Sequence, residues 1–145
     1  MSRIAHFAMA AAIAVGSLFT APDLSRAGFL FEEPVSVGLC AAPRYLNKIA
    51  YRFRYQVRHV PFLPDVAIAN FYDVHQTHFF PVVARHPIER VYCAAKAILS
   101  DGDVRDVWYV IEGRMGFASI GDNVEFCVSG FDRWMVYDGN CRVLR

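Results

Sequence analysis

The sequence predicts an α+β domain: one helix packed on an antiparallel sheet of about five or six strands, stapled by disulfides and preceded by a cleaved signal peptide. Three observations predict this class. Apolar residues recur at helical spacing after residue 43, runs of β-forming residues separated by turn signals follow, and the number of cysteines is even. The 145-residue chain has no internal repeat or linker, so we expect a single domain after the targeting segment.

Residues 1–27 have the pattern of a secretory signal peptide. Arg3 provides a positive start, residues 4–19 are apolar, and Ser25-Arg26-Ala27 places small residues at both positions that a signal peptidase reads. A membrane anchor is the alternative, but the apolar run is shorter than the ~20 residues that span a bilayer. We therefore expect a periplasmic or secreted domain over residues 28–145, with no stable membrane span after cleavage.

The exported part is nearly neutral. It carries 13 basic and 13 acidic residues once Arg3, Arg26 and Asp23 are set aside, so its charge offers no case for a nucleic-acid partner. Arginine outnumbers lysine 11 to 2 in this part, which favours fixed, hydrogen-bonded cations over solubilising ones. No Gly-rich phosphate loop, Gly-x-Ser-x-Gly or His-Glu-x-x-His motif is present, so no cofactor is expected.

All four cysteines lie in the exported part. An even number in a small exported domain predicts two disulfides, and the absence of Cys-x-x-Cys indicates neither a redox-active pair nor a zinc knuckle. Three connectivities are open. We favour Cys40–Cys93, which would tie the N-terminal segment to a central strand, together with Cys127–Cys141, which would close a short local loop.

The helix is expected to begin at Pro43, because proline is tolerated at the first helical position. The apolar residues at helical spacing are Leu46, Ile49, Ala50, Phe53 and Val57. Residues 51–58 also alternate aromatic or apolar with polar side chains, so a strand is the competing interpretation. We predict a helix from Pro43 to Tyr55.

A central hairpin over Glu89–Glu112 is the predicted scaffold of the domain. Asp101-Gly102 is typical of a type I′ turn, in which both central residues have positive φ. A two-residue loop would place Leu99 opposite Val104 and Cys93 opposite Val110. Both faces are apolar near the open end, so we expect cover on both faces.

The other strands are predicted on either side of this hairpin. Residues 66–74 and 76–83 are rich in β-forming residues and predict a first hairpin. Residues 113–121 are punctuated by glycine and predict a connection in which Phe117 and Ile120 point inward. Residues 123–128 predict a further strand, and residues 134–137 its returning partner.

Some of these features resemble a family of small, exported, uncharacterised bacterial proteins. The resemblance covers nearly all of the exported part. It is carried by the four cysteines in order, Ile49 with Arg52-Phe53, Tyr92 before Cys93, Ser100-Asp101-Gly102, Tyr109, Gly116-Phe117, Val124-Glu125, Gly130-x-Asp132-Arg133, Tyr137 and Arg142. The resemblance implies export and a shared fold, and it implies no activity.

Catalytic patterns are weak. His75-x-x-His78 is the nearest approach to a metal motif, but in an extended segment an odd separation places the two rings on opposite faces, so no metal is expected. Glu125 is the only weak catalytic candidate. It shares a strand face with Cys127 and Trp134, so we expect it to be partly buried and paired with an arginine. The three candidate partners are Arg90, Arg133 and Arg142.

Arg52, Arg54 and Arg58 interleave with Tyr51 and Tyr55 as a basic–aromatic patch. With Arg133 and Glu125 they are the weak ligand-binding candidates. We expect a non-catalytic domain that binds a protein or an anionic component of the cell envelope. The alternative is a small hydrolase-like or ligand-binding cleft that uses Glu125 with an arginine.

Overall fold

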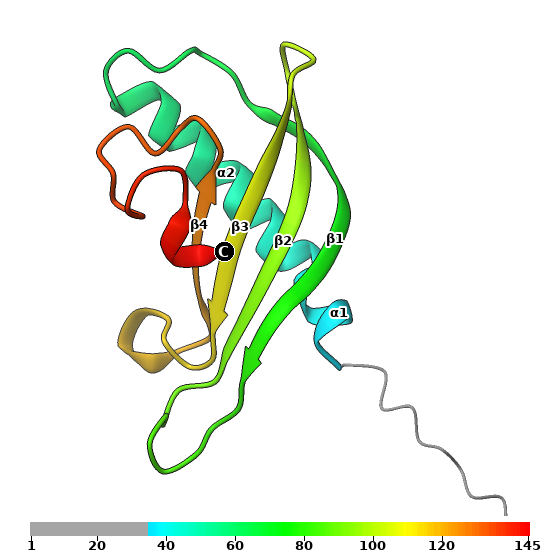
Figure 1. Ribbon diagram of the computed structural model, residues 1–145, viewed down its shortest axis with the longest axis vertical. Coiled ribbons are helices and arrows are strands. Elements are labelled where there is room, and N and C mark those ends of the chain that lie inside the picture. Colours follow the sequence, from blue (N-terminus) through cyan, green and yellow to red (C-terminus); the bar gives the residue numbers. More distant parts are fainter. Residues whose placement is uncertain (1–34) are drawn as a thin grey trace, which may run out of the picture. The chain divides into compact units, whose positions relative to one another are not determined.

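The computed structural model describes residues 35–145, so the predicted signal peptide and its cleavage site lie outside the described residues. Two helices come first, α1 (Val35–Cys40) and α2 (Pro43–His59). The strands are β1 (Ile68–Phe80), β2 (Arg90–Leu99), β3 (Val104–Glu112) and β4 (Asn123–Val128), with 3₁₀ turns η1 (Phe117–Ser119) and η2 (Arg142–Leu144). They form one antiparallel sheet in the order β1-β2-β3-β4 (Figure 1). The α+β class is confirmed, with four strands in the described part instead of the larger number expected.

Helix α2 is the predicted helix, and the strand interpretation of residues 51–58 is wrong. Proline opens it, and its buried side chains follow one another at four-residue spacing: Tyr45, Ile49, Phe53 and Val57. The helix continues past Tyr55 to His59, where Val60 turns extended and donates its N–H to the Gln56 carbonyl at 2.9 Å. Pro61 then prevents further helix.

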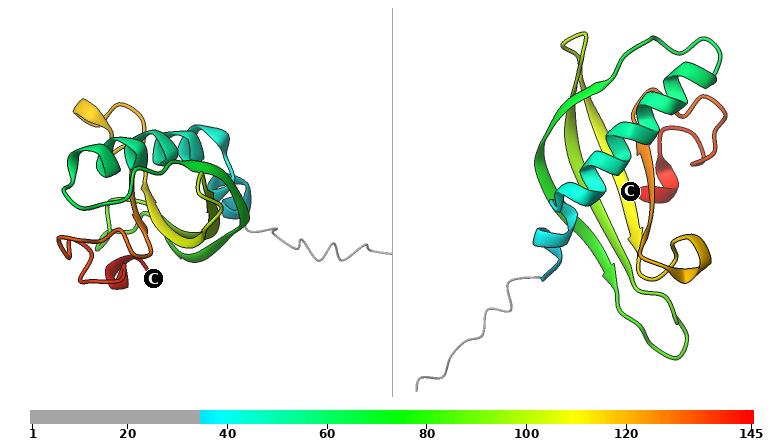
Figure 2. Two further views of the ribbon diagram at one scale, coloured as in Figure 1. Left: turned by 90° about the horizontal axis from the view of Figure 1, so that it is seen from above. Right: turned by 180° about the vertical axis from the view of Figure 1, so that it is seen from behind.

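The main core lies between α2 and the sheet, which curls toward the helix (Figure 2). Phe53 is fully buried at its centre and packs edge to face against Phe131, with ring centroids 4.8 Å apart. The sheet contributes one apolar face, which includes Val91, Val107, Tyr109, Ile111, Val124 and Val128. Helix and sheet therefore bury one another, as the apolar stripe of α2 requires.

The central hairpin forms where predicted, but its register is shifted by one residue. The Leu99 N–H donates to the Asp103 carbonyl at 2.8 Å, and the Gly102 N–H donates to the Leu99 carbonyl at 3.0 Å. The loop therefore has three residues, and Gly102 alone within it has positive φ, at 91°. Cys93 lies opposite Tyr109 instead of Val110, and every side chain of β3 changes face relative to the prediction.

Strand β1 replaces the predicted hairpin of residues 66–74 and 76–83. Only one residue separates those two segments, and the chain keeps its direction through a bulge in which Asp73 has φ 52°. The irregularities also alter the side-chain alternation. His75 pairs with Ala94 and His78 with Tyr92, so both rings lie on the face of the sheet away from α2, and the expectation of opposite faces is wrong.

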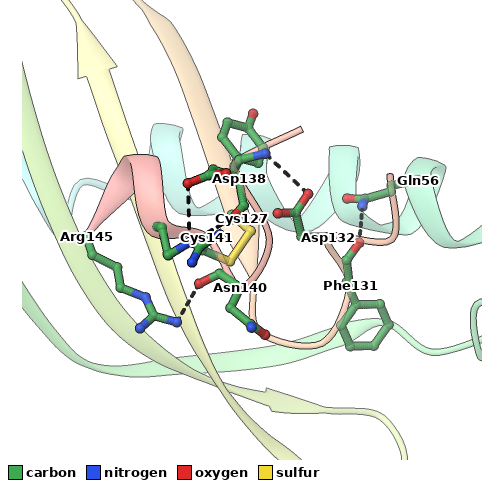
Figure 3. The surroundings of a disulfide bond; sticks show 10 residues. Gln56, Cys127, Phe131, Asp132, Asp138, Asn140, Cys141 and Arg145 are labelled. Carbon is green, nitrogen blue, oxygen red and sulfur yellow. Dashed lines mark hydrogen bonds and ion pairs between the residues drawn. A yellow bond between two sulfur atoms is a disulfide. The ribbon is translucent and has the colours of Figure 1, made fainter. Parts of the chain in front are cut away.

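The C-terminal segment covers that outer face. Strand β4 has the predicted bounds, but residues 134–137 form turns instead of a strand. The chain folds back so that Cys141 bonds to Cys127 (Figure 3). Leu144 and Val110 belong to the same buried cluster as this disulfide. The expectation that both faces are covered is confirmed.

Both predicted disulfides are confirmed. Cys40–Cys93 joins the end of α1 to β2, with Cα atoms 5.8 Å apart, and Cys127–Cys141 has Cα atoms 5.5 Å apart. Cys40 and Cys93 are fully buried, and the Tyr109 hydroxyl donates to the Cys40 carbonyl at 2.7 Å. Within residues 35–145, none of the helices has the length and apolar character needed to cross a membrane.

The connection after β3 is a closed loop that projects from the sheet. The Gly116 N–H donates to the Gly121 carbonyl at 2.9 Å across its neck. Phe117 is 95 % exposed and Ile120 is 80 % exposed, so the prediction that they point inward is wrong.

Candidate functional site

The outward face of α2 is basic and aromatic. No acidic residue occurs between Pro43 and His59, and the cations are Arg44, Lys48, Arg52, Arg54 and Arg58. Among the described residues, only Arg54 of these has a carboxylate partner, Asp65. Tyr51 and Tyr55 are exposed, and the Tyr55 ring stacks on His59 with centroids 3.8 Å apart. This face therefore offers cations with free charge next to flat apolar surfaces.

One row of α2 side chains holds the helix to the edge of the sheet. The donors Lys48, Arg52 and Gln56 follow at four-residue spacing and so share one side of the helix. Their acceptors are the backbone carbonyls of Asp122 at 3.2 Å, Val124 at 2.6 Å and Phe131 at 3.0 Å, in that order. Val124 belongs to β4, an edge strand that would otherwise be open to pairing, and Asp122 and Phe131 lie just before and after it. Arg52 thus has a defined position while keeping its charge.

Beside this row lies a cleft of about 270 Å³. Helix α2 contributes Arg52 and Gln56, β4 contributes its C-terminal residues, and the loop after β4 forms the far wall. That loop brings four side chains of different chemistry to the cleft: Asp132, Arg133, Trp134 and Tyr137. The volume suits a small group or part of a chain, not a large ligand.

One carboxylate oxygen in the cleft has no hydrogen-bond donor. Asp132 Oδ1 accepts the Tyr137 backbone N–H at 3.3 Å, while Oδ2 is buried and has no hydrogen bond among the described residues (Figure 3). Burial raises the pKa of Tyr137, and the negative charges of Glu125 and Asp132 raise it further, against the opposing effect of Arg52. Tyr137 is therefore neutral at physiological pH.

The aromatic wall of the cleft is partly open. Trp134 is 65 % exposed, and the Arg133 guanidinium lies over the Phe62 ring, 4.9 Å from its centroid. Arg52 and Arg133 both line the cleft with a single carboxylate, so its charge is positive. Such a site can hold an anionic group through its two arginines. The free oxygen of Asp132 can accept one hydrogen bond from another part of the same ligand.

The predicted ligand-binding arginines are divided by the fold. Arg52 and Arg133 meet at the cleft, whereas Arg54 turns to the other side of α2 and pairs with Asp65. Arg58 is exposed near the end of the helix. Sequence reasoning missed Gln56 and the aromatic residues of the loop. The spacing of Gln56 from Arg52 was the available signal, since residues four apart on a helix share a side.

Glu125 is not placed as expected. It shares the outer face with Cys127, but it is exposed and does not line the cleft. Its three expected partners lie elsewhere: Arg90 pairs with Glu112 at 2.9 Å, Arg142 pairs with Asp138 at 3.3 Å, and Arg133 stacks on Phe62. The expected burial and ion pair are therefore wrong.

His75 and His78 share a face, yet within residues 35–145 no three His, Cys, Asp or Glu side chains are arranged to hold a metal ion. The fold and the site define a small, disulfide-linked α+β domain with a basic helix face and an adjoining cleft. Comparison of the chain with protein-family models, curated proteins and solved structures yields no match.

Proposed function

We propose that this chain is an exported domain that binds an anionic component of the cell envelope through the outward face of α2 and the cleft beside it. The observation that carries the proposal is the set of α2 cations without a carboxylate partner among the described residues, namely Arg44, Lys48, Arg52 and Arg58. Charges left unpaired on one face attract an anion, even on a domain whose net charge is near zero.

The composition of the site supports an oxygen anion as the ligand. Guanidinium groups match phosphate and carboxylate groups through paired N–H donors, and Arg52 and Arg133 both line the cleft. Trp134 and Tyr137 add aromatic surface against which an apolar part of the ligand can pack. Two intramolecular disulfides support an oxidising compartment, and hence export. The resemblance noted above supports the same location.

The hydrolase-like alternative stays a prediction, and the geometry offers it little support. Hydrolysis by acid and base needs two carboxylates that meet across a cleft. Asp132 is the only carboxylate among the residues that line the cleft, and Glu125 lies outside them. Binding without catalysis therefore agrees better with the residues present.

The proposal is tested by titration of the disulfide-bonded chain with polyphosphate in solution. The variant R44Q/R58Q removes two charges from the α2 face, and R142Q/R145Q removes two exposed charges of the C-terminal segment. We expect the first variant to bind about tenfold more weakly, from roughly 0.7 kcal/mol per exposed charge, and the second to bind like the parent chain. Equal loss in both variants, or no binding by the parent chain, would refute a specific role for this face.

A further inference from the structure

Two connections at one end of the sheet carry exposed apolar side chains. In the antiparallel order β1-β2-β3-β4, the β1–β2 and β3–β4 connections emerge at the same end, which is the lower end in Figure 1. We call this set of side chains the apolar tip. It consists of Val82, Val83, Met115, Phe117 and Ile120, all exposed by 45 % or more.

The β2–β3 turn at the opposite end of the sheet is Ser100-Asp101-Gly102-Asp103, which has two carboxylates and no apolar side chain. Phe62 and Val104 are exposed near that end, but they lie on different segments. Single exposed apolar residues are ordinary, whereas several on one short loop mark a contact surface. Met115, Phe117 and Ile120 all belong to the one closed loop around η1.

The backbone holds the tip outward. A Cβ atom at Gly116 would lie 2.0 Å from the Ile120 carbonyl oxygen, so the loop around η1 closes as tightly as glycine permits. The Arg114 N–H donates to Asp122 Oδ1 at 3.2 Å on one side of its base. On the other side the Gly113 N–H donates to the Glu89 carbonyl at 2.9 Å, which joins the two connections. Phe117 is therefore displayed by an ordered loop.

Cations lie in the two connections and in the neighbouring part of α2. Arg85 and Arg114 belong to the two connections. On α2, Arg44 donates to the Tyr45 hydroxyl, which in turn donates to the Asp122 carboxylate, and Lys48 donates to the Asp122 carbonyl. The carboxylates at this end are Glu89, Glu112 and Asp122. Glu112 is paired with Arg90, and Asp122 accepts hydrogen bonds from the Tyr45 hydroxyl and the Arg114 N–H. The exposed charge at this end is positive.

We propose that the apolar tip inserts into the surface of an anionic membrane and that the anionic component bound by this domain is the lipid headgroup layer. This inference rests on the proposed function, because it assigns that function's ligand. Exposed apolar side chains with cations beside them match the layers of such a surface, where acyl chains lie beneath negative headgroups. In Figure 2 the loop around η1 projects on the same side of the sheet as α2, so the basic helix face and the tip can meet one membrane together.

Co-sedimentation with lipid vesicles tests the insertion. The disulfide-bonded chain is mixed with vesicles of phosphatidylcholine, with or without phosphatidylglycerol, and binding is expected only with the anionic lipid. F117S/I120S should weaken partition by about tenfold or more, because two apolar side chains no longer leave water. The control V104S/V143S removes two exposed valines that lie outside the tip, the α2 face and the cleft, and it should partition like the parent chain.

The variant F117W reports how deeply the tip enters the bilayer. We expect the fluorescence that the new tryptophan adds to that of the parent chain to shift to shorter wavelength on anionic vesicles and to be quenched by acyl-brominated lipid. Unchanged emission and quenching, or undiminished partition of F117S/I120S, would overturn the insertion. Self-association of the parent chain through the tip, without vesicle binding, would also overturn it and indicate a second copy as occupant.

Binding to polyphosphate separates the two proposals. A F117S/I120S variant that loses vesicles but retains polyphosphate affinity supports insertion of the tip. A parent chain that binds polyphosphate and ignores anionic vesicles overturns the membrane inference and leaves the α2 site standing. A parent chain that binds neither probe overturns both.

Discussion

Replacement of Tyr109 by phenylalanine tests how the two layers of this fold are joined. Tyr109 is fully buried on β3, and its hydroxyl donates to the Cys40 carbonyl at 2.7 Å. Cys40 is bonded to Cys93, which lies directly opposite Tyr109 on β2. The substitution removes one oxygen, leaves the ring in place and deprives a buried carbonyl of this donor.

The expected cost follows from that carbonyl. A buried acceptor without a partner costs about 1–3 kcal/mol, and the missing oxygen leaves almost no cavity. We therefore expect the free energy of unfolding of Y109F to fall by about 2 kcal/mol, and its Tm by roughly 5–10 °C for a domain of this size. Urea and thermal unfolding at neutral pH, followed by near-ultraviolet circular dichroism with both disulfides intact, measure the change.

The pH dependence provides a second, independent check. Burial raises the pKa of Tyr109 far above its ordinary value of about 10, so the folded state keeps a proton that the unfolded state loses. This contribution is fully present below about pH 10 and is lost as pH rises toward the folded pKa, at up to about 1.4 kcal/mol per pH unit. Y109F has no hydroxyl to ionise at this position, so its free energy of unfolding does not fall for this reason as pH rises. The difference in stability between Y109F and the parent chain should therefore shrink in alkali. Tyr45 and Tyr137, whose pKa values are also raised, contribute a residual slope in both proteins.

Equal stability of Y109F and the parent chain at neutral pH, with parallel curves into alkali, would refute the reasoning. It would mean that the hydroxyl exchanges its bond to Cys40 for water at no cost. A loss of well over 3 kcal/mol would also contradict the assignment, because it would require a change in packing beyond one hydrogen bond.

Three further outcomes can be checked. C127S/C141S should lower the free energy of unfolding by about 3 kcal/mol, as expected for a loop of about 15 residues, and limited proteolysis should then cut the C-terminal segment first. E125Q should leave the free energy of unfolding in urea unchanged within about 0.5 kcal/mol, because the side chain is exposed; a larger change would indicate a hidden partner. G116A should destabilise the loop around η1, because its Cβ would meet the Ile120 carbonyl oxygen at 2.0 Å, and faster amide exchange there would show it.

Part of the candidate site could be predicted from sequence. The basic–aromatic pattern of α2 identified Arg52, and the turn after β4 contained Asp132 and Arg133. Their meeting at one cleft could not be predicted, because it depends on the loop after β4 folding back toward the helix. Glu125 is the opposite case, because it was predicted for the site and the fold leaves it outside. Its alternation with Cys127 assigned the correct face, but the exposure of its side chain depends on which distant segments pack on that face.

The sequence by itself determined the features that depend on neighbours in the chain. Helix α2 follows from an apolar repeat of four, β4 from a run of β-forming residues between turn signals, and the position of the central turn from Asp101-Gly102. The even number of cysteines determined that bridges form, although their pairing had three solutions. In each case the preference of the backbone acts over a few residues and needs no distant contact.

Tertiary structure decided the register, the bulge and the direction of the exposed side chains. An Asp-Gly pair fits a two-residue or a three-residue loop, and only the packing of Tyr109 and Ile111 against α2 selects the latter. The bulge at Asp73 lets β1 run on and brings His75 and His78 to one face. Burial is a property of surfaces brought together from distant segments, so local pattern could not decide it.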